Sequence, residues 1–238
     1  MSNLEAAREW LAAAKSVAVL TGAGISAESG VPTFRGAGGL WKQYKAEELA
    51  TPEAFARDPR LVWEWYDWRR GVMKPAQPNA AHKALVELEI RKRVFTLITQ
   101  NIDGLHDLAG SGKILKLHGD IWRMRCTQCG ANWPDRRAPL PKLPPHCACG
   151  GLARPGVVWF GEPLPDGMMK EAEHAAAAAE VLLVIGTSAV VYPAAGLIPY
   201  ARQAGAKVIE VNIEETAASS IVDCALRGAA GEILPRLI

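Results

Sequence analysis

Two groups of polar side chains stand directly after apolar segments, and their types suit acid–base chemistry. The apolar run Val94–Ile98 is followed by Thr99–His106, which holds two amides, a carboxylate and a glycine. A second apolar run, Ile114–Leu117, is followed by His118. Ligands bind outside the carboxyl ends of the strands in open parallel sheets, so both groups are expected at one site. A histidine there can accept a proton near pH 7, as chemistry at an amide or a sugar requires.

A glycine loop follows a third apolar strand, Ser16–Leu20. The pattern Gly22-x-Gly24-x-x-Ala27 matches a loop that binds the pyrophosphate of a dinucleotide, with alanine in the third position. The glycines let the backbone approach a phosphate, and the N-terminus of a following helix attracts an anion. We expect Ser26 to cap that helix. Taken alone, the pattern is equally typical of a plain tight turn.

The loop also departs from the pattern of dehydrogenases. In those enzymes, a second strand ending in an acid follows about 20 residues later. Here the chain enters the glycine-rich segment Gly30–Trp41, which includes an arginine and two aromatic residues. Such a segment suits a flap over a ligand. Hydride transfer is therefore not the favoured function.

Four of the five cysteines form two closely spaced pairs, Cys126-x-x-Cys129 and Cys147-x-Cys149. Each pair can supply two thiolates to one tetrahedral Zn²⁺ ion, and the glycines that follow suit the turns of a zinc ribbon. His146 is an alternative ligand beside the second, tighter pair. Four protein ligands leave no open position, so we expect one zinc ion with a structural role.

Composition narrows the class of protein. The chain has 238 residues, of which 49 % are hydrophobic, and a net charge of +2. These values fit one large domain or two small ones. No long basic run predicts nucleic-acid binding, no apolar stretch of about 20 residues predicts a membrane span, and the N-terminus lacks a targeting pattern. We expect a cytoplasmic monomer that binds neither membranes nor nucleic acids directly.

The remaining pattern predicts an α/β fold, because apolar strands alternate with helices. Such alternation is typical of a parallel sheet covered on both faces. Strands are expected at residues 16–20, 94–98, 114–117, 181–185 and 207–211, and helices at 80–89, 167–180 and 194–204. Two segments interrupt the alternation. One, from about 34 to 80, is rich in tryptophan, and the other, 123–152, holds the paired cysteines. We predict that these insertions together form a smaller lobe.

Taken together, these motifs resemble those of the sirtuins, which are NAD-dependent protein-lysine deacylases. The resemblance runs from about Val17 to Leu234, and its most specific parts are Gly22–Ser26 with Phe34–Gly36, and Thr99–His106. It implies a single catalytic domain. The core would be a Rossmann-like parallel sheet of about residues 1–33, 81–122 and 153–238, and the smaller lobe would combine a helical module, 34–80, with a zinc ribbon, 123–152.

The resemblance also implies a role for each matching residue. His118 is the expected general base. The residues expected to bind NAD are Gly22, Ala23, Gly24, Ile25, Ser26, Ala27, Gly30, Thr33, Phe34, Arg35, Trp41, Gln100, Asn101, Ile102, Asp103, Gly186, Thr187, Ser188, Asn212, Glu214 and Ala230. The residues expected to pair with an acyl-lysine peptide as an added strand are Val158, Trp159, Phe160 and Gly161.

The implied reaction gives these residues distinct tasks. The acyl-lysine oxygen attacks the ribose carbon as nicotinamide leaves, within a polar pocket that shields the sugar cation from water. His118 then accepts a proton from a ribose hydroxyl, and the products are free lysine, nicotinamide and O-acyl-ADP-ribose. Because His118 must be neutral, activity is expected to fall at acidic pH. By contrast, His106, Asp120 and Cys224 are assigned structural positions.

Acyl selectivity is assigned to the segment Trp63–Arg70. On a helix, Tyr66 and Arg69 lie three residues apart and share a face. A phenol beside a guanidinium can bind a carboxylate through charge-assisted hydrogen bonds. In isolation this pair is more typical of a solvated helix face. In the context of the resemblance it is similar to the pair of class III sirtuins, so we expect action on succinyl- and malonyl-lysine, with acetyl-lysine as a further substrate.

Three alternatives stay open. An NAD-dependent protein ADP-ribosyltransferase would share the fold and the first chemical step. A non-catalytic module that senses NAD or binds through its zinc ribbon is disfavoured by the combination of His118, Asn101 and Asp103. A dehydrogenase is the most distant alternative.

Overall fold

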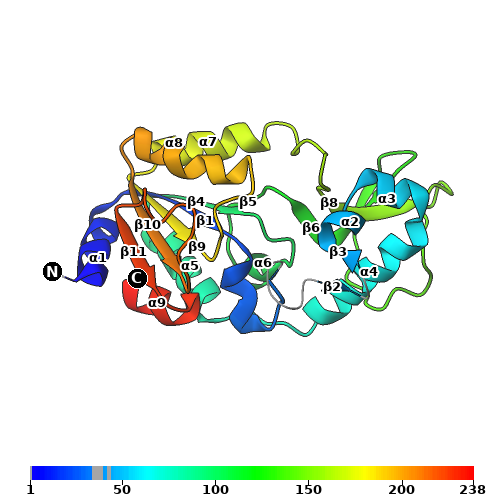
Figure 1. Cartoon of the computed structure of the whole chain (residues 1–238), viewed down its shortest axis with the longest axis horizontal. Coiled ribbons are helices and arrows are strands. Elements are labelled where there is room, and N and C mark those ends of the chain that lie inside the picture. Colours follow the sequence, from blue (N-terminus) through cyan, green and yellow to red (C-terminus); the bar gives the residue numbers. More distant parts are fainter. Residues whose placement is uncertain (1, 34–39, 42–43) are drawn as a thin grey trace.

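The computed structural model describes residues 2–33, 40–41 and 44–238. Two residues expected to contact NAD, Phe34 and Arg35, lie outside the described residues, and of Trp41 the structure describes the backbone alone. Two lobes lie side by side along the long axis of the molecule (Figure 1). The larger contains both ends of the described chain.

A six-stranded parallel sheet forms the larger lobe, in the order β11–β10–β9–β1–β4–β5. The strands are β1 (Ser16–Thr21), β4 (Val94–Thr99), β5 (Ile114–Lys116), β9 (Val181–Ile185), β10 (Lys207–Asn212) and β11 (Cys224–Arg227). The chain leaves β1 toward β4 and β5, and it returns to the other side of β1 to form β9. The crevice at the carboxyl ends of β1 and β9 is therefore a topological switch point, where open α/β sheets bind ligands.

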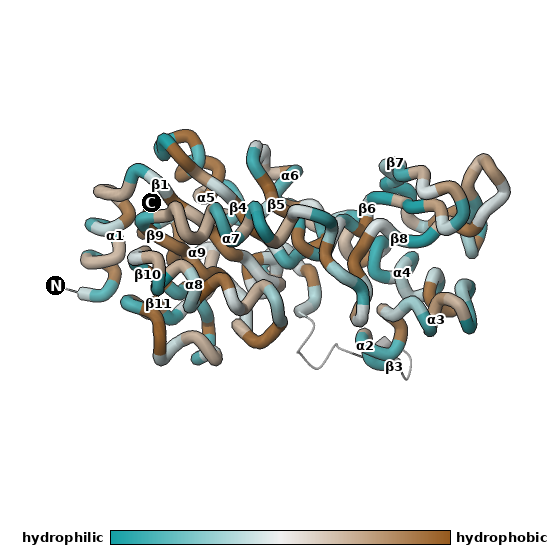
Figure 2. Tube along the Cα trace, turned by 90° about the horizontal axis from the view of Figure 1, so that it is seen from above, coloured by the Kyte–Doolittle hydropathy of each residue, from teal (hydrophilic) through white to brown (hydrophobic). Residues whose placement is uncertain are grey.

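Helices cover both faces of this sheet. One face carries α1 (Asn3–Ala13), α5 (Ala80–Arg91) and α9 (Ala230–Leu237), and the other carries α7 (Met168–Ala178), η2 (Ala194–Gly196) and α8 (Leu197–Gln203) (Figure 1). Alternate residues of β1 serve the two layers. Val17 and Val19 pack on the first face, and Ala18 and Leu20 pack on the second. Burial on both faces explains why most positions of β1, β4 and β9 are apolar. Figure 2 shows the hydropathy along the trace.

The smaller lobe combines short helices with a three-stranded antiparallel sheet of order β7–β6–β8. Its elements are β2 (Leu40–Trp41), β3 (Tyr44–Lys45), α2 (Ala46–Leu49), α3 (Pro52–Arg57), α4 (Pro59–Met73), β6 (Gly119–Cys126), β7 (Asn132–Pro134) and β8 (Ala153–Val157). Residues from both insertions share one apolar core, among them Trp63, Tyr66 and Met124. Trp122 and Trp159, which flank the second insertion, belong to the same core. The sheet extends past residues 123–152, because β6 and β8 already pair at Gly119 and Val157.

The predicted strands are confirmed, each with its ends displaced by no more than one residue. The helix expected at 194–204 is divided into η2 and α8. Strand β11 was not predicted, since its four residues include Arg227 and lack a long apolar run. Within the described ranges, no helix combines the length and apolar character needed to cross a membrane.

Candidate active site and metal centre

A cavity of about 760 Å³ lies at the carboxyl ends of the central strands and is walled by both lobes. Its size is typical of small-molecule and cofactor sites. The predicted residues that line it are Gly22, Ala23, Gly24, Thr33, Tyr66, Arg69, Gln100, Asn101, Ile102, His118, Val158, Trp159, Phe160, Gly161, Gly186, Thr187, Ser188, Asn212, Glu214 and Ala230.

The glycine loop is shaped by contact with a second loop, which follows β9. A Cβ atom on Gly22 would lie 2.8 Å from the carbonyl oxygen of Gly186, and one on Gly24 would lie 2.7 Å from the Gly186 Cα. Gly186 itself adopts a left-handed conformation with φ of +58°. The glycines thus allow two strand-end loops to pack against each other. This packing requires glycine in addition to any close approach of a phosphate.

Ser26 does not cap the helix after the glycine loop, contrary to the prediction. The segment is a 3₁₀ helix, η1 (Ala23–Ser29), whose N-cap is Gly22, and Ser26 lies inside it with no solvent exposure. Its hydroxyl instead donates a hydrogen bond of 2.8 Å to Asp103 Oδ2. The two residues are 77 positions apart in the chain, so local sequence could not indicate the contact.

A network of amides and hydroxyls fixes the floor of the cavity. Asn101 Nδ2 donates to the carbonyl oxygen of Gly22 at 3.0 Å and to Ser26 Oγ at 3.3 Å. Asp103 is buried and accepts a hydrogen bond from the backbone N–H of Leu105, where α6 (Leu105–Ala109) begins. Burial raises the pKa of the Asp103 carboxyl. Asp103 therefore acts on the cavity through Ser26 and Asn101, since it does not itself line the wall.

The opposite wall is held in a similar way. Gln100 Nε2 donates to Thr187 Oγ1 at 3.0 Å, and Asn212 Nδ2 donates to the carbonyl oxygen of Thr187 at 2.9 Å. Three strand ends, those of β4, β9 and β10, are thus tied together by side chains. Cavity-lining residues that the sequence did not indicate include Glu28, Val191, Tyr192 and Ile213. No motif marks Glu28 on η1 or the three loop positions, and Tyr192 is 75 % exposed.

His118 is positioned as a proton acceptor. Its Nδ1 lies 3.0 Å from the carbonyl oxygen of Gln100. A carbonyl accepts but cannot donate, so Nδ1 carries the proton and Nε2 keeps a free lone pair. Burial lowers the pKa of His118 below its ordinary value, although the bond to Gln100 opposes that shift. The imidazole is therefore neutral near pH 7 and lines the cavity with a basic nitrogen.

Tyr66 and Arg69 enter the cavity from α4. Both are nearly buried, with 1 % and 8 % exposure. The Arg69 guanidinium lies 5.0 Å from the centre of the Trp65 ring and 5.8 Å from that of Tyr66. Burial lowers the pKa of Arg69 and raises that of Tyr66 to about 12. Arginine keeps its charge in proteins, so at neutral pH the pair presents a cation beside a protonated phenol.

Four predicted residues near the glycine loop are placed away from the cavity wall: Ile25, Ser26, Ala27 and Gly30. Ile25 is fully buried in the core of the larger lobe, whereas Ala27 and Gly30 are exposed. The segment Val158–Gly161 does line the wall. Its N–H groups are partly used within the chain, because Val158 donates to His118 O at 3.0 Å and Phe160 donates to Ala50 O at 2.9 Å.

Two buried histidines lie behind the site, with ring centres 4.8 Å apart. His106 contacts Thr21 Oγ1 at 3.1 Å, and His82 contacts Asn79 Oδ1 at 3.0 Å. Burial lowers the pKa of His82 to about 4 and that of His106 to about 3. Both are therefore neutral in the folded protein at mildly acidic pH.

This pair predicts acid sensitivity. Below pH 6.5 the two histidines are protonated in the unfolded chain but stay neutral in the folded chain. The free energy of unfolding therefore falls as the pH drops toward 4. Each imidazole contributes a slope of about 1.4 kcal/mol per pH unit in that window. Urea titrations of the wild type and of His82→Asn between pH 7 and 4.5 measure the slope of the unfolding free energy against pH. A slope that is equally steep in both proteins would contradict this assignment.

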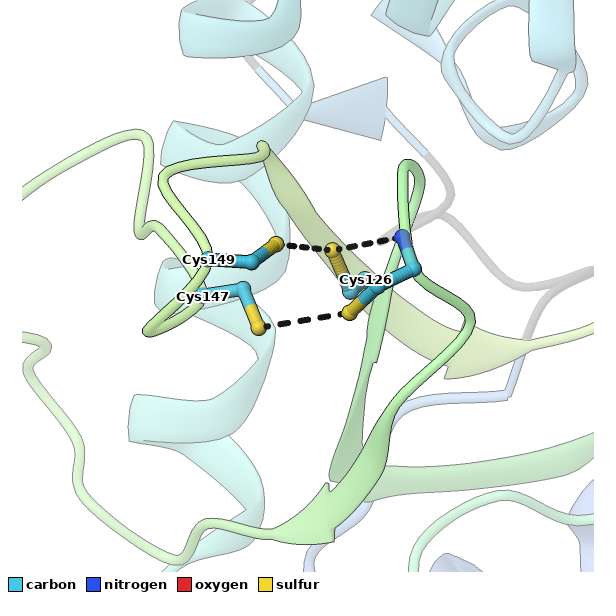
Figure 3. Close-up of side chains that lie close together, drawn as sticks. Cys126, Cys147 and Cys149 are labelled. Carbon is cyan, nitrogen blue, oxygen red and sulfur yellow. Dashed lines mark hydrogen bonds between the residues drawn. The ribbon is translucent and has the colours of Figure 1, made fainter.

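The paired cysteines converge at the far end of the smaller lobe. The sulfur atoms of Cys126, Cys129, Cys147 and Cys149 all lie within 4.8 Å of one another. The Sγ atoms of Cys126 and Cys149 are 3.5 Å apart, and those of Cys129 and Cys147 are 3.8 Å apart (Figure 3). A tetrahedral ion with metal–sulfur bonds of about 2.3 Å separates its ligands by about 3.8 Å. The four sulfurs can therefore hold one metal ion.

The ligand set is suited to binding a cation as thiolates. Backbone N–H groups of Gln128 and Cys129 point to Cys126 Sγ, each at 3.4 Å, and the bond from Cys129 is the main cause that lowers the Cys126 pKa to about 6. His146 is not part of the described cluster, and its Nδ1 lies 3.1 Å from the carbonyl oxygen of Pro144. Cys224 is buried elsewhere, in the core of the larger lobe.

Comparisons with known proteins agree with this architecture. A model of the Sir2 family matches residues 22–193. NAD-dependent protein deacylase 2 of Pyrobaculum aerophilum is 56 % identical over 229 residues, which cover 96 % of this chain and 92 % of that protein. The NAD-dependent protein deacylase of Aquifex aeolicus is 57 % identical over 209 residues, 87 % of each chain.

Solved structures show the same fold. A crystal structure of a Sir2 homologue in complex with NAD superposes with a TM-score of 0.93 at 49 % identity, covering 98 % of this chain and 91 % of that one. A Sir2 protein bound to a myristoylated histone peptide superposes with a TM-score of 0.80 at 38 % identity, covering 99 % and 94 %. The chain therefore belongs to the Sir2 family, the sirtuins, and is an NAD-dependent protein deacylase.

Proposed function

We propose that this sirtuin removes succinyl and malonyl groups from protein lysines, and acetyl groups as well, with nicotinamide and O-acyl-ADP-ribose as the other products. The observation that carries the proposal is the placement of Tyr66 and Arg69 in the wall of the cavity that His118 also lines. A guanidinium and a phenol together match the geometry and charge of a carboxylate. An acyl chain ending in a carboxylate is the substrate that uses both groups.

The residues of the cavity fit NAD as the co-substrate. The glycine loop, the paired strand ends and the amides of Gln100 and Asn101 offer close backbone approach and hydrogen bonds to a dinucleotide. When bound, NAD supplies the electrophilic ribose carbon and the nicotinamide leaving group. In this proposal the neutral His118 accepts the proton of a ribose hydroxyl at Nε2, and the enclosing walls exclude water.

We also propose that the metal ion is Zn²⁺. Four thiolates in a tetrahedral arrangement are the typical structural zinc site and leave no position for a reacting group. The ion would stabilise the far end of the smaller lobe rather than take part in deacylation.

Replacement of Arg69 by methionine is expected to lower kcat/KM for a succinyl-lysine peptide by about 100-fold, because a charge-assisted hydrogen bond contributes about 1.5–3 kcal/mol. The rate for an acetyl-lysine peptide should change by less than about threefold, since that acyl group lacks a charge. Arg60→Met is a matched control on the same helix, because Arg60 is 73 % exposed. Equal losses on both peptides would contradict the assigned selectivity.

The first experiment is mass spectrometry of one lysine peptide in its acetylated and succinylated forms, incubated with and without NAD. NAD-dependent formation of O-succinyl-ADP-ribose at a higher rate than the acetyl product supports the proposal. A myristoylated peptide is a useful third substrate, because a related Sir2 protein binds one. Loss of acetyl or myristoyl groups alone would exclude carboxylate recognition, and transfer of ADP-ribose to protein would point to the transferase alternative.

A further inference from the structure

Trp159 occupies an unexpected position. The sequence predicts that it contributes backbone to a strand formed with the substrate peptide, but its side chain turns into the smaller lobe and is 3 % exposed. Its ring centre lies 5.2 Å from that of Phe55 on α3. Its indole nitrogen lies 2.9 Å from the hydroxyl oxygen of Tyr66 on α4. The indole therefore links the 158–161 segment to the proposed acyl pocket.

The direction of that hydrogen bond is fixed by chemistry. An indole N–H can donate but cannot accept, so Tyr66 Oη is the acceptor. The hydroxyl proton of Tyr66 must then point to another group. Arg69, which lies beside it, offers only donors. Among the residues that the structure describes, no acceptor for this proton is seen, and Tyr66 is one of the residues that line the cavity. The remaining partner for the Tyr66 hydroxyl proton is a hydrogen-bond acceptor on a bound ligand.

The indole is itself held in place from behind. The Arg154 guanidinium stacks on its ring with a separation of 3.4 Å to the ring centre. Glu162 binds that guanidinium with both carboxylate oxygens, at 2.5 and 2.8 Å, and also accepts the backbone N–H of Trp159 at 2.9 Å. A side chain held by a stacked guanidinium, by a tilted contact with the Phe55 ring and at its backbone has little rotational freedom. The orientation of the Tyr66 hydroxyl is thus set before a substrate arrives.

We infer that Trp159 is a specificity-determining positioning residue, whose indole N–H occupies a lone pair of Tyr66 Oη and directs the Tyr66 proton toward an acceptor at the distal end of the acyl chain. The inference rests on the proposed function, because the acceptor it requires is the carboxylate of a succinyl or malonyl group. An acetyl group ends in a methyl and makes no use of this proton. Trp159 therefore distinguishes acyl groups without contacting them through a polar atom.

Trp159→Phe tests the inference, because it removes the N–H and keeps an aromatic ring. The ratio of the KM for a succinyl-lysine peptide to the KM for the matching acetyl-lysine peptide is expected to rise about tenfold. Trp63→Phe is the matched control. Trp63 is also buried in the smaller lobe, but its indole N–H donates to the carbonyl oxygen of Ala153 at 2.8 Å rather than to Tyr66. It should affect both peptides alike.

A double-mutant cycle with Tyr66→Phe separates a positioning role from a structural one. If Trp159 acts through the Tyr66 hydroxyl, Trp159→Phe will have no further effect on succinyl KM once that hydroxyl is gone. Additive effects, or equal changes for both peptides, would overturn the inference while leaving the proposed function intact. A wild-type protein that does not act on succinyl-lysine would remove the proposed acyl preference and the inference together.

Discussion

Replacement of His118 by alanine is expected to reduce the rate of NAD-dependent deacylation by about 10²–10⁴-fold, the usual contribution of a positioned general base. The loss should be the same for acetyl and succinyl peptides, because the proposed proton transfer takes place at the sugar and not at the acyl chain. NAD binding, measured by calorimetry, should be largely kept. A variant with near wild-type turnover would remove His118 from the proposed catalytic role.

The pH profile provides a second measurement of the same residue. Burial lowers the pKa of His118 below its ordinary value, so the neutral imidazole predominates at pH 7. The value of kcat/KM should therefore change little between pH 8 and pH 7 and decline at lower pH. His174→Ala is a suitable control, since His174 is an exposed histidine on α7. A profile that begins to fall above pH 7 would contradict a depressed pKa.

Substitution of Cys126 by serine is expected to release the metal and to lower the melting temperature by roughly 10 °C or more. Structural zinc sites contribute a large part of the folding free energy of small metal-binding domains, and about 1 kcal/mol shifts the melting temperature of a chain of this length by about 2–4 °C. Cys126 is the most buried of the four ligands. Metal content by mass spectrometry and thermal unfolding by calorimetry measure the two effects.

Cys224→Ala is the matched control for this experiment. It removes a buried thiol from the larger lobe, far in sequence from the four clustered sulfurs. It should keep one metal ion per chain and lose only the stability expected of a small core substitution. Retention of the metal by Cys126→Ser, or its loss from both variants, would contradict the four-cysteine site.

The sequence predicted the larger lobe well, because burial on two faces requires apolar residues at successive positions of a strand. Strands β1, β4, β5 and β9 of the central sheet are mainly apolar, and the polar residues that follow them reach the same edge. Hence His118, Gln100 and Asn101 could be assigned to one site before their contacts were known. The cysteine spacing was equally direct, because two thiolates on one tight turn already form half of a metal site.

Contacts between distant segments could not be predicted. The bond from Ser26 to Asp103 replaces a helix cap, and the bond from Trp159 to Tyr66 spans 93 residues. Neither leaves a periodic pattern, because each depends on how two lobes and several loops meet. The closeness of Gly24 to Gly186 is a further case. The glycines are visible in the sequence, but the backbone that occupies their Cβ positions is not.

The construction of the smaller lobe from two insertions has a consequence for its synthesis. A ribosome adds about 5–20 residues per second, so the 93 residues between Tyr66 and Trp159 separate their emergence by roughly 5–20 s. For more than half of that interval the nascent helix α4 lacks β6, and until nearly its end it lacks β8, the strands that pack in one core with Trp63 and Tyr66 in the finished protein. The proposed acyl pocket is thus completed late, and its aromatic residues remain without their β8 neighbours for most of the synthesis of the smaller lobe.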